Sequence, residues 1–232
     1  MRRVLQMPCR HEENVRKLLR GGGQVFALRG YANATVREIC TAAGVNVAAV
    51  SYYFGGKEKL YISVLEDFLE TGERLCPYDD GAFPASAPEE HLRAFVRHLL
   101  TTFSGGCGVD DGLRRLLLHE CLDPASIAQN LLRSYFDTKR GQLAHILSAL
   151  HPSCGEGLVR RMCVAVIWQC FQFVYACGPA SVLIKDSGLE GQDIEDMCEF
   201  LVGLCVGGMA HLGRGWNGNW VEDIPSLAAV ST

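Results

Sequence analysis

Apolar residues recur at spacings of three and four from residue 14 to residue 211, and no segment sustains an alternation of apolar and polar positions. The first spacing is typical of amphipathic helices, whereas alternation is typical of strands. The sequence therefore predicts an all-α fold. We expect helices at residues 14–29, 36–43, 47–53, 57–75, 89–103, 110–122, 124–150, 157–177 and 191–211.

Several of these helices have residues that favour their ends. Asp123 precedes Pro124, which gives a capping carboxylate followed by a proline at the first helical position. Gly213 is placed to end the last helix. The segment 77–88 is rich in Pro, Gly, Asp and Ser, so we expect a loop there.

Two short helices near residue 40 form a recognisable pair. Thr35 and Glu38 have the spacing of a capping box that begins the first helix, and Gly44 can end it in a left-handed conformation. Asn46 can cap a second helix that runs to Tyr53. Two helices of two turns joined by such a turn predict a helix-turn-helix, in which the second helix enters the DNA major groove.

The charge of the chain is divided unevenly along its 232 residues. Residues 1–60 carry ten basic and four acidic residues, a net charge of +6, and the remainder has a net charge of −10. A basic segment attached to an acidic body is typical of a polyanion-binding module fused to another domain. An uneven surface without function would give the same composition, so the motifs must decide.

Two other features bear on where the chain works. The eleven cysteines include no Cys-x-x-Cys pair, and the sequence shows no secretory signal, so we expect reduced thiols in the cytoplasm. Residues 162–184 contain no charge, but Gln169, Gln172 and the Gly178-Pro179 pair interrupt them. We therefore expect a buried helix and no membrane span.

The segments Gly30-Tyr31, Thr35 to Ile39, Ala43 to Asn46 and Tyr53 to Leu60 resemble the signature of the TetR family of transcriptional regulators. Residues 46–58 are more narrowly similar to the CecR-like branch of that family. The resemblance implies an N-terminal three-helix DNA-binding domain at residues 1–60. It also implies a larger helical ligand-binding and dimerisation domain at residues 61–213, followed by a tail at 214–232.

The resemblance also indicates which residues contact DNA. Thr35, at a helix N-terminus, is suited to hold a phosphate, and Arg37 to bind a guanine edge or a phosphate. Small apolar groups at the start of the second helix would meet thymine methyls, tyrosine and serine hydroxyls would reach bases or phosphates, and Lys57 would contact a phosphate. The expected DNA-binding residues are Thr35, Arg37, Asn46, Val47, Ala48, Ala49, Ser51, Tyr52, Tyr53 and Lys57. Gly21-Gly22-Gly23 departs from the family's alanine-rich first helix and predicts a locally loose helix.

Binding to two half-sites of a palindromic operator requires two copies of the short second helix about 34 to 36 Å apart, so we expect a homodimer. The last two predicted helices repeat cysteines every seven residues and place two glycines on one face. The expected dimer interface comprises Val159, Cys163, Val166, Cys170, Cys198, Gly203, Cys205 and Gly207.

The resemblance further implies a pocket for a small-molecule inducer in the acidic body. Its expected lining residues are Tyr135, Phe136, Trp168, Gln169, Gln172, Phe173 and Tyr175. We expect no catalytic residues, no metal site and no cofactor, since neither a nucleophile and base nor metal ligands occur at functional spacing. The sequence thus predicts a ligand-responsive transcriptional regulator, most simply a repressor. A helical small-molecule enzyme, or an adaptor whose basic segment binds an acidic protein, remains the alternative.

Overall fold

The structure is a computed structural model that describes residues 10–79, 87–104, 111–122, 127–176 and 194–212. These residues form α-helices and no strand. The helices are α1 (Arg10–Asn33), α2 (Val36–Ala43), α3 (Ala48–Phe54), α4 (Lys57–Leu75), α5 (Pro88–Ser104), α6 (Asp111–Leu122), α7 (Gln129–Leu150), α8 (Glu156–Ala176) and α9 (Ile194–Leu212). The predicted all-α fold is confirmed.

The predicted helix boundaries agree closely with those of the structure. The ranges expected for α2 and α4 are those observed, and α1 contains a break at Gly30, which has φ 70°, one residue after its expected end. The helix expected from residue 124 begins at Gln129 in the described part of the chain, because residues 127 and 128 form a turn. Asp123, Pro124, Gly213 and the tail at 214–232 lie outside the described residues.

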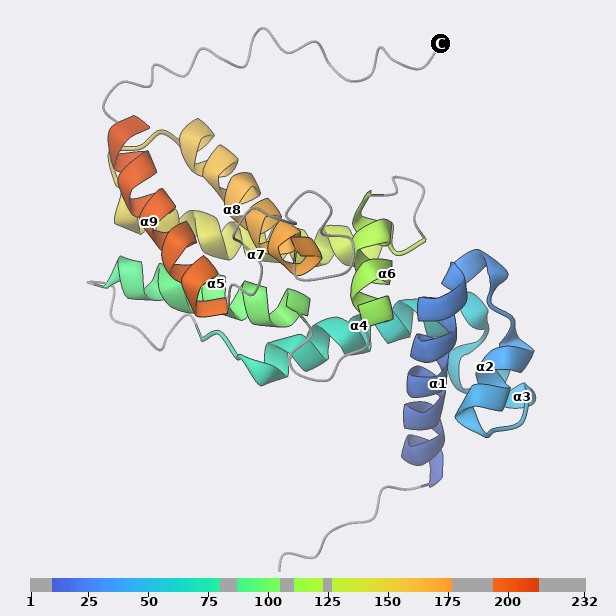
Figure 1. Ribbon diagram of the computed structural model, residues 1–232. Coiled ribbons are helices and arrows are strands. Elements are labelled where there is room, and N and C mark those ends of the chain that lie inside the picture. The colour runs from blue at the N-terminus through green and yellow to red at the C-terminus, as the bar shows by residue number, and fades with distance from the viewer. Residues whose placement is uncertain (1–9, 80–86, 105–110, 123–126, 177–193, 213–232) are drawn as a thin grey trace, which may run out of the picture.

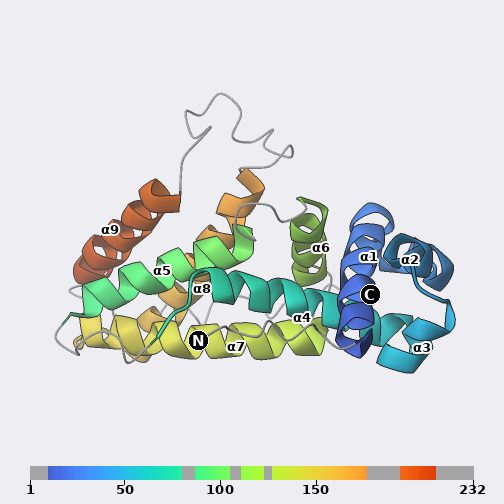
Figure 2. The same ribbon diagram turned by 90° about the horizontal axis from the view of Figure 1, so that it is seen from below.

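The helices fall into two groups joined by α4. Helices α1, α2 and α3 form one end of the molecule, and α4 runs from them into a larger body built from α5, α7, α8 and α9 (Figure 1). Helix α6 stands beside α1 at the junction, and α7 lies along α5 when the molecule is seen from below (Figure 2). Helices α4 and α6 both contact α1 and therefore connect the body to the small group of helices.

The junction is held by aromatic packing around Tyr61 of α4. This side chain is fully buried, and its ring lies 4.8 Å from that of Phe26 and 5.0 Å from that of Tyr31. Its hydroxyl donates a hydrogen bond of 2.7 Å to Glu120 of α6. Burial and the neighbouring carboxylate raise the pKa of Tyr61, which keeps the hydroxyl protonated as a donor.

The three successive glycines of α1 are buried where α1 meets its neighbours. A Cβ atom on Gly21 would lie 2.8 Å from the backbone nitrogen of Ala43 in α2, a distance that real Cβ contacts do not show. On Gly23 it would lie 3.3 Å from a methyl group of Leu113 in α6. The expectation of a locally loose helix was wrong, since these glycines allow α1 to pack closely against α2 and α6.

Helix α9 is fastened to α5 by two arginine–glutamate pairs. Arg93 Nε lies 2.6 Å from Glu199 Oε1, and Arg97 Nε lies 2.7 Å from Glu195 Oε1. Cys198, between the two glutamates, is buried. Because both arginines approach their carboxylates through two nitrogens, the pairs also fix how α9 is rotated about its axis.

The cysteines of the described helices are free thiols, most of them buried. Burial raises the pKa of Cys163 to about 11 and that of Cys205 to about 12, so these thiols stay protonated near neutral pH. No group of His, Cys, Asp and Glu within the described residues could hold a metal ion. Among the helices described, none has the length and apolarity needed to cross a membrane.

Candidate nucleic-acid interface

The start of α2 is fixed by the capping box expected from the sequence. The Thr35 hydroxyl accepts a hydrogen bond from the Glu38 backbone N–H at 3.2 Å, and Glu38 Oε2 accepts one from the Thr35 backbone N–H at 3.0 Å. Arg29 of α1 lies 3.3 Å from the same Glu38 carboxylate. The cap thus fixes both the beginning of α2 and its position relative to the end of α1.

The turn between α2 and α3 is set by a glycine and an asparagine. Gly44 has φ 64° and ends α2, where its N–H bonds to the carbonyls of Cys40 and Thr41. Asn46 Oδ1 accepts a hydrogen bond of 2.9 Å from the Ala48 N–H and so caps α3. Ile39 and Val50 are buried between the two helices and α1, which holds α2, the turn and α3 as a helix-turn-helix.

One face of this helix-turn-helix is open to solvent. Arg37 is exposed, and its guanidinium makes no ion pair with any described residue. Val47 is 51% exposed and Tyr52 is 77% exposed, a high value for large side chains in a short helix. Ala48 and Ser51 are exposed beside them, so the leading half of α3 projects outward with small and hydroxyl-bearing groups.

Four of the ten residues expected to contact DNA already have polar partners within the domain. Thr35 and Asn46 cap helices, as described above. Tyr53 accepts a hydrogen bond of 3.0 Å from Asn14 Nδ2 and packs edge-on against the His11 ring. Tyr53 therefore holds α3 against α1, although its hydroxyl keeps a proton to donate.

Lys57 is the most firmly held of these four. Its ammonium group donates to the carbonyls of Tyr31 at 2.9 Å and Ala34 at 3.0 Å, and it lies 4.3 Å from the centre of the Tyr31 ring. Two of its three donors are thereby used to satisfy carbonyls near the end of α1. Lys57 joins α4 to the chain between α1 and α2, a role that the sequence did not suggest.

The residues expected to line an inducer pocket do not surround one space. Trp168, Gln169 and Gln172 are exposed on α8, and Phe173 is buried in the core. Phe136 packs against Phe103 and Phe171, while the side chain of Tyr175 lies outside the described part. One cavity in the body, of about 480 Å³, is lined by Tyr135 and by none of the other six. The exposed and buried residues of α8 lie on different faces of that helix, so they do not share one surface.

That cavity involves residues which the sequence did not single out. Glu73 of α4, His98 of α5 and Lys139 of α7 meet at its wall. A signal for Lys139 was present, since it stands seven residues after Leu132 and four before Leu143, both buried. A lysine on a core-facing stripe indicates a buried charge, but its partners are distant in sequence.

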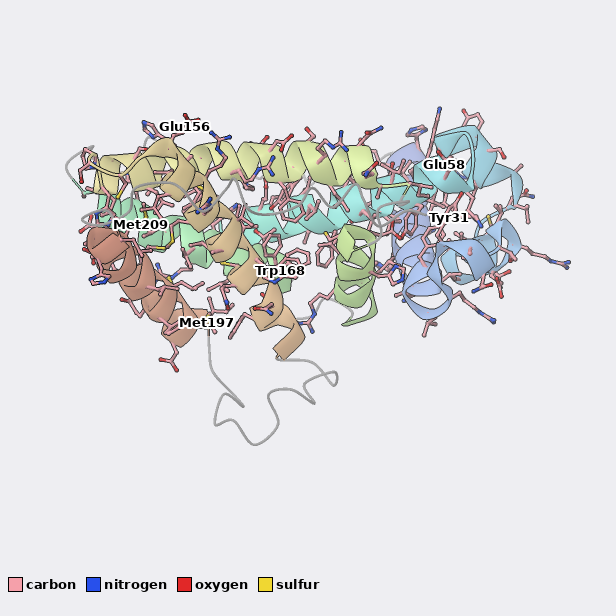
Figure 3. The ribbon with its side chains drawn as sticks, turned by 90° about the horizontal axis from the view of Figure 1, so that it is seen from above. Tyr31, Glu58, Glu156, Trp168, Met197 and Met209 are labelled. Carbon is pink, nitrogen blue, oxygen red and sulfur yellow. The ribbon has the colours of Figure 1, made fainter. Side chains whose placement is uncertain are left out.

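The residues of the expected dimer interface also divide into a buried group and an exposed group. Most of its residues pack inside the subunit and are at most 4% exposed, and these are Val159, Cys163, Val166, Cys170, Cys198 and Cys205. They cannot meet a partner, because the subunit's own helices cover them. Gly203 and Gly207 are exposed on α9. Figure 3 shows α8 and α9, with Trp168, Met197 and Met209, well away from Tyr31 and Glu58.

Comparison with known proteins gives a family match for the small group of helices. Residues 18–64 match the model of the bacterial regulatory proteins of the tetR family. The chain is 42% identical over 71 residues to the HTH-type transcriptional dual regulator CecR of Shigella flexneri, a match covering 29% of this chain and 31% of that protein. It is 33% identical over 97 residues to the HTH-type transcriptional regulator BetI of Brucella suis, covering 41% and 46%. The matches thus span less than half of these relatives.

Similarity to solved structures extends over most of the chain. A TetR-like transcriptional regulator from Rhodococcus superposes with a TM-score of 0.64 at 18% identity, covering 85% of this chain and 96% of that one. The regulator FadR from Bacillus subtilis, solved with stearoyl-CoA, superposes with a TM-score of 0.57 at 20% identity, covering 83% and 98%. At such identities the likeness concerns the fold.

Proposed function

With residues 18–64 identified as a tetR-family N-terminal domain, we propose that the protein is a DNA-binding transcriptional regulator that acts as a homodimer and responds to a small molecule. The DNA-binding domain comprises residues 1–60, and the ligand-binding and dimerisation domain comprises residues 61–213. Repression is the simplest mode, in which ligand binding lowers operator affinity.

The observation that carries this proposal is the open face of α2 and α3. A recognition helix must present its leading residues to the major groove, and Val47, Ala48, Ser51 and Tyr52 of α3 are exposed, as is Arg37 of α2. An enzyme or an adaptor would not require a helix-turn-helix with this exposed face. The basic balance of residues 1–60 supplies the salt-dependent attraction to phosphates.

Sequence readout is divided between one strong and several weak contacts. Arg37 is the residue of this face that can form a forked pair with guanine, whereas Val47 and the alanines after it can touch only thymine methyls. Thr35, Asn46, Tyr53 and Lys57 position the helices, with backbone N–H groups at the start of α2 free to meet a phosphate. Specificity then depends on Arg37 and on DNA shape.

A dimer would place two recognition helices on one face of the operator. The exposed apolar side chains of α8 and α9 suit this contact: Val164 is 55% exposed, Trp168 44%, Phe200 61% and Leu204 43%. At Gly203 and Gly207, no atom lies within 4 Å of the position that a Cβ atom would occupy, so a partner helix can approach closely there. This face replaces the buried cysteine stripe as the proposed interface.

The arrangement of α4 supports release by a small molecule. This helix carries Lys57 in the DNA-binding end and Glu73 at the cavity of the body. A ligand that binds one conformation of the body better than another shifts the recognition helices, typically with 1 to 3 kcal/mol of coupling. The Bacillus subtilis neighbour, solved with stearoyl-CoA, supports a ligand-responsive body.

The test is a gel shift with DNA flanking the protein's own gene, using the wild type, Arg37→Ala and the control Arg160→Ala, whose side chain is 71% exposed on α8. We expect Arg37→Ala to weaken specific binding by about 5- to 150-fold per half-site, the value of one forked base contact, and a dimer loses this contact at both half-sites. Arg160→Ala should bind as the wild type does. Equal binding of all three proteins to operator and random DNA would contradict the proposal and favour the enzyme or adaptor.

A further inference from the structure

The cavity of about 480 Å³ in the body is bounded by the end of α4, the segment that follows it, α5 and α7. Its lining includes Glu73 of α4, Tyr78 of the following segment and His98 of α5. Helix α7 adds Tyr135, Lys139 and Gln142, which lie on successive turns. The cavity therefore combines a few charged groups with aromatic walls, as small-molecule sites do.

Lys139 brings a positive charge into the interior at this wall. Its side chain is 8% exposed, and its ammonium lies 2.8 Å from Glu73 Oε1 and 3.0 Å from His98 Nε2. His98 Nδ1 lies 2.5 Å from the Cys76 carbonyl and donates to it, so Nε2 is the acceptor for Lys139. Burial and the lysine charge lower the pKa of His98, which keeps the imidazole neutral.

Two residues that line the cavity each have a buried polar atom without a hydrogen-bond partner among the described residues. These are the Tyr135 hydroxyl and Gln142 Oε1. Burial and the nearby Glu73 carboxylate raise the pKa of Tyr135, so the hydroxyl remains a donor. Unpaired buried groups are costly, and a bound acceptor would give the Tyr135 hydroxyl a partner.

The character of the site points to an anionic ligand. Lys139 and Tyr135 are donors, and Glu73 is the acceptor that now neutralises the lysine. The Glu73 side chain is 40% exposed, so its carboxylate can turn to solvent at little cost when another anion takes its place. A cation would be repelled by Lys139, and a neutral molecule would leave the ion pair intact.

We propose that this cavity binds an organic carboxylate with an aromatic body, whose carboxylate replaces that of Glu73 on the Lys139 ammonium. The Tyr135 hydroxyl donates to the second carboxylate oxygen. The aromatic body packs against Tyr78 and Leu131. The exchange breaks the salt bridge between Glu73, in the last turn of α4, and Lys139 of α7.

The consequence for DNA rests on the proposed function. Helix α4 begins at Lys57, which holds the carbonyls of Tyr31 and Ala34, and it ends two residues after Glu73. Untying its far end from α7 allows the helix to tilt and to carry Lys57 with it. Ligand binding itself requires no DNA and is measured separately.

The test is calorimetry on the full chain with 2-naphthoate, 2-naphthamide and 2-naphthylmethylamine, which share one ring system and differ in charge. We expect naphthoate to bind about tenfold or more tightly than the other two, because it alone can pair with Lys139. Equal binding of all three probes, or preferred binding of the amine, would overturn the proposal.

Three variants place the binding at this wall. Lys139→Met should lose naphthoate binding about tenfold or more, whereas Glu73→Gln should bind it about threefold to tenfold more tightly, since the competing carboxylate is gone. Arg140→Gln, an exposed neighbour on α7, is the matched control and should bind as the wild type does. Circular dichroism checks that each variant is folded, and Glu73→Gln decides the matter if Lys139→Met does not fold. Weaker or unchanged binding by Glu73→Gln would contradict the exchange.

Gel shifts on the same proteins without ligand test the proposed function independently. If the protein binds naphthoate as expected but binds no specific DNA, the ligand site is supported and the assignment as a regulator is rejected. A chain that binds its operator but shows no preference for naphthoate keeps the regulator assignment, and the proposed carboxylate site is rejected.

Discussion

Adding one methyl group at Gly21 or at Gly22 should have opposite effects on stability, although both residues are buried in the middle of α1. A Cβ atom at Gly21 would lie 2.8 Å from the Ala43 nitrogen and 3.0 Å from its Cα atom, both backbone atoms that cannot rotate away. At Gly22 the nearest atoms are side-chain methyls of Val64 at 3.4 Å and Leu60 at 3.6 Å, which is ordinary contact. The two positions therefore differ in crowding.

The magnitude follows from two opposed terms. Replacing glycine by alanine inside a helix gains about 0.8 to 1 kcal/mol of helix propensity at either position. Forcing a methyl group against the backbone costs about 1 to 3 kcal/mol through displacement of neighbouring atoms. We expect Gly22→Ala to stabilise the protein by up to about 1 kcal/mol, and Gly21→Ala to be about 1 to 3 kcal/mol less stable than Gly22→Ala.

Urea unfolding followed by circular dichroism measures the difference, and hydrogen exchange locates it. The Gly21→Ala change should speed exchange of the α2 amides, because α2 must move away from α1, whereas Gly22→Ala should leave them unchanged or slower. Gel shifts should show weaker operator binding for Gly21→Ala alone. A Gly21→Ala protein as stable as Gly22→Ala, with unchanged α2 exchange, would refute the close-packing explanation.

Three further predictions concern a cap, a buried histidine and the outer face of the body. Lys57→Met should lower the free energy of unfolding by at least about 1.5 to 3 kcal/mol, the value of one charge-assisted hydrogen bond, since two such bonds to carbonyls are lost. A loss of DNA binding with unchanged unfolding in urea would show instead that Lys57 contacts phosphate. The pKa of His98 is lowered from its ordinary 6.5, so the unfolded chain binds more protons and stability should fall as the pH drops below about 6.5. His98→Gln should remove this part of the pH dependence in unfolding curves measured between pH 5 and pH 8, and an identical dependence would count against a neutral buried imidazole. The side chain of Leu204 on α9 is 43% exposed, and Leu204→Glu should convert a dimer to folded monomers, as measured by light scattering. The control Glu156→Gln should remain dimeric. If the Leu204→Glu protein is still a dimer, the interface lies on another surface.

Much of the DNA-binding end could be predicted from the sequence, because its decisive features are local. The capping box of Thr35 and Glu38 and the left-handed Gly44 act within a few residues, so their types and spacing alone determine where α2 begins and ends. The helices of the body follow from the spacing of apolar residues for the same reason. The two short helices and their turn then predicted the helix-turn-helix, and the family resemblance indicated which of its residues contact DNA.

The surfaces of the body could not be predicted in this way. The central turns of α8 have apolar residues on both sides, so the sequence did not show that Cys163 is covered and Trp168 exposed. The structure buries Cys163 at 2% exposure and leaves Trp168 at 44%. Which side is covered depends on how α5, α7 and α9 pack around α8, and helical periodicity does not encode that choice.

The sequence by itself determined the helices, their caps and the helix-turn-helix, since these depend on interactions between residues a few positions apart. Only the tertiary structure decided that Gly21 is a point of close approach, that Lys57 caps α1 and that Lys139 meets Glu73 and His98 at a cavity. Each of these depends on atoms brought together from distant parts of the chain. The structural role of a buried charge or of a glycine depends on the residues that folding places next to it. Local sequence spacing does not predict those neighbours.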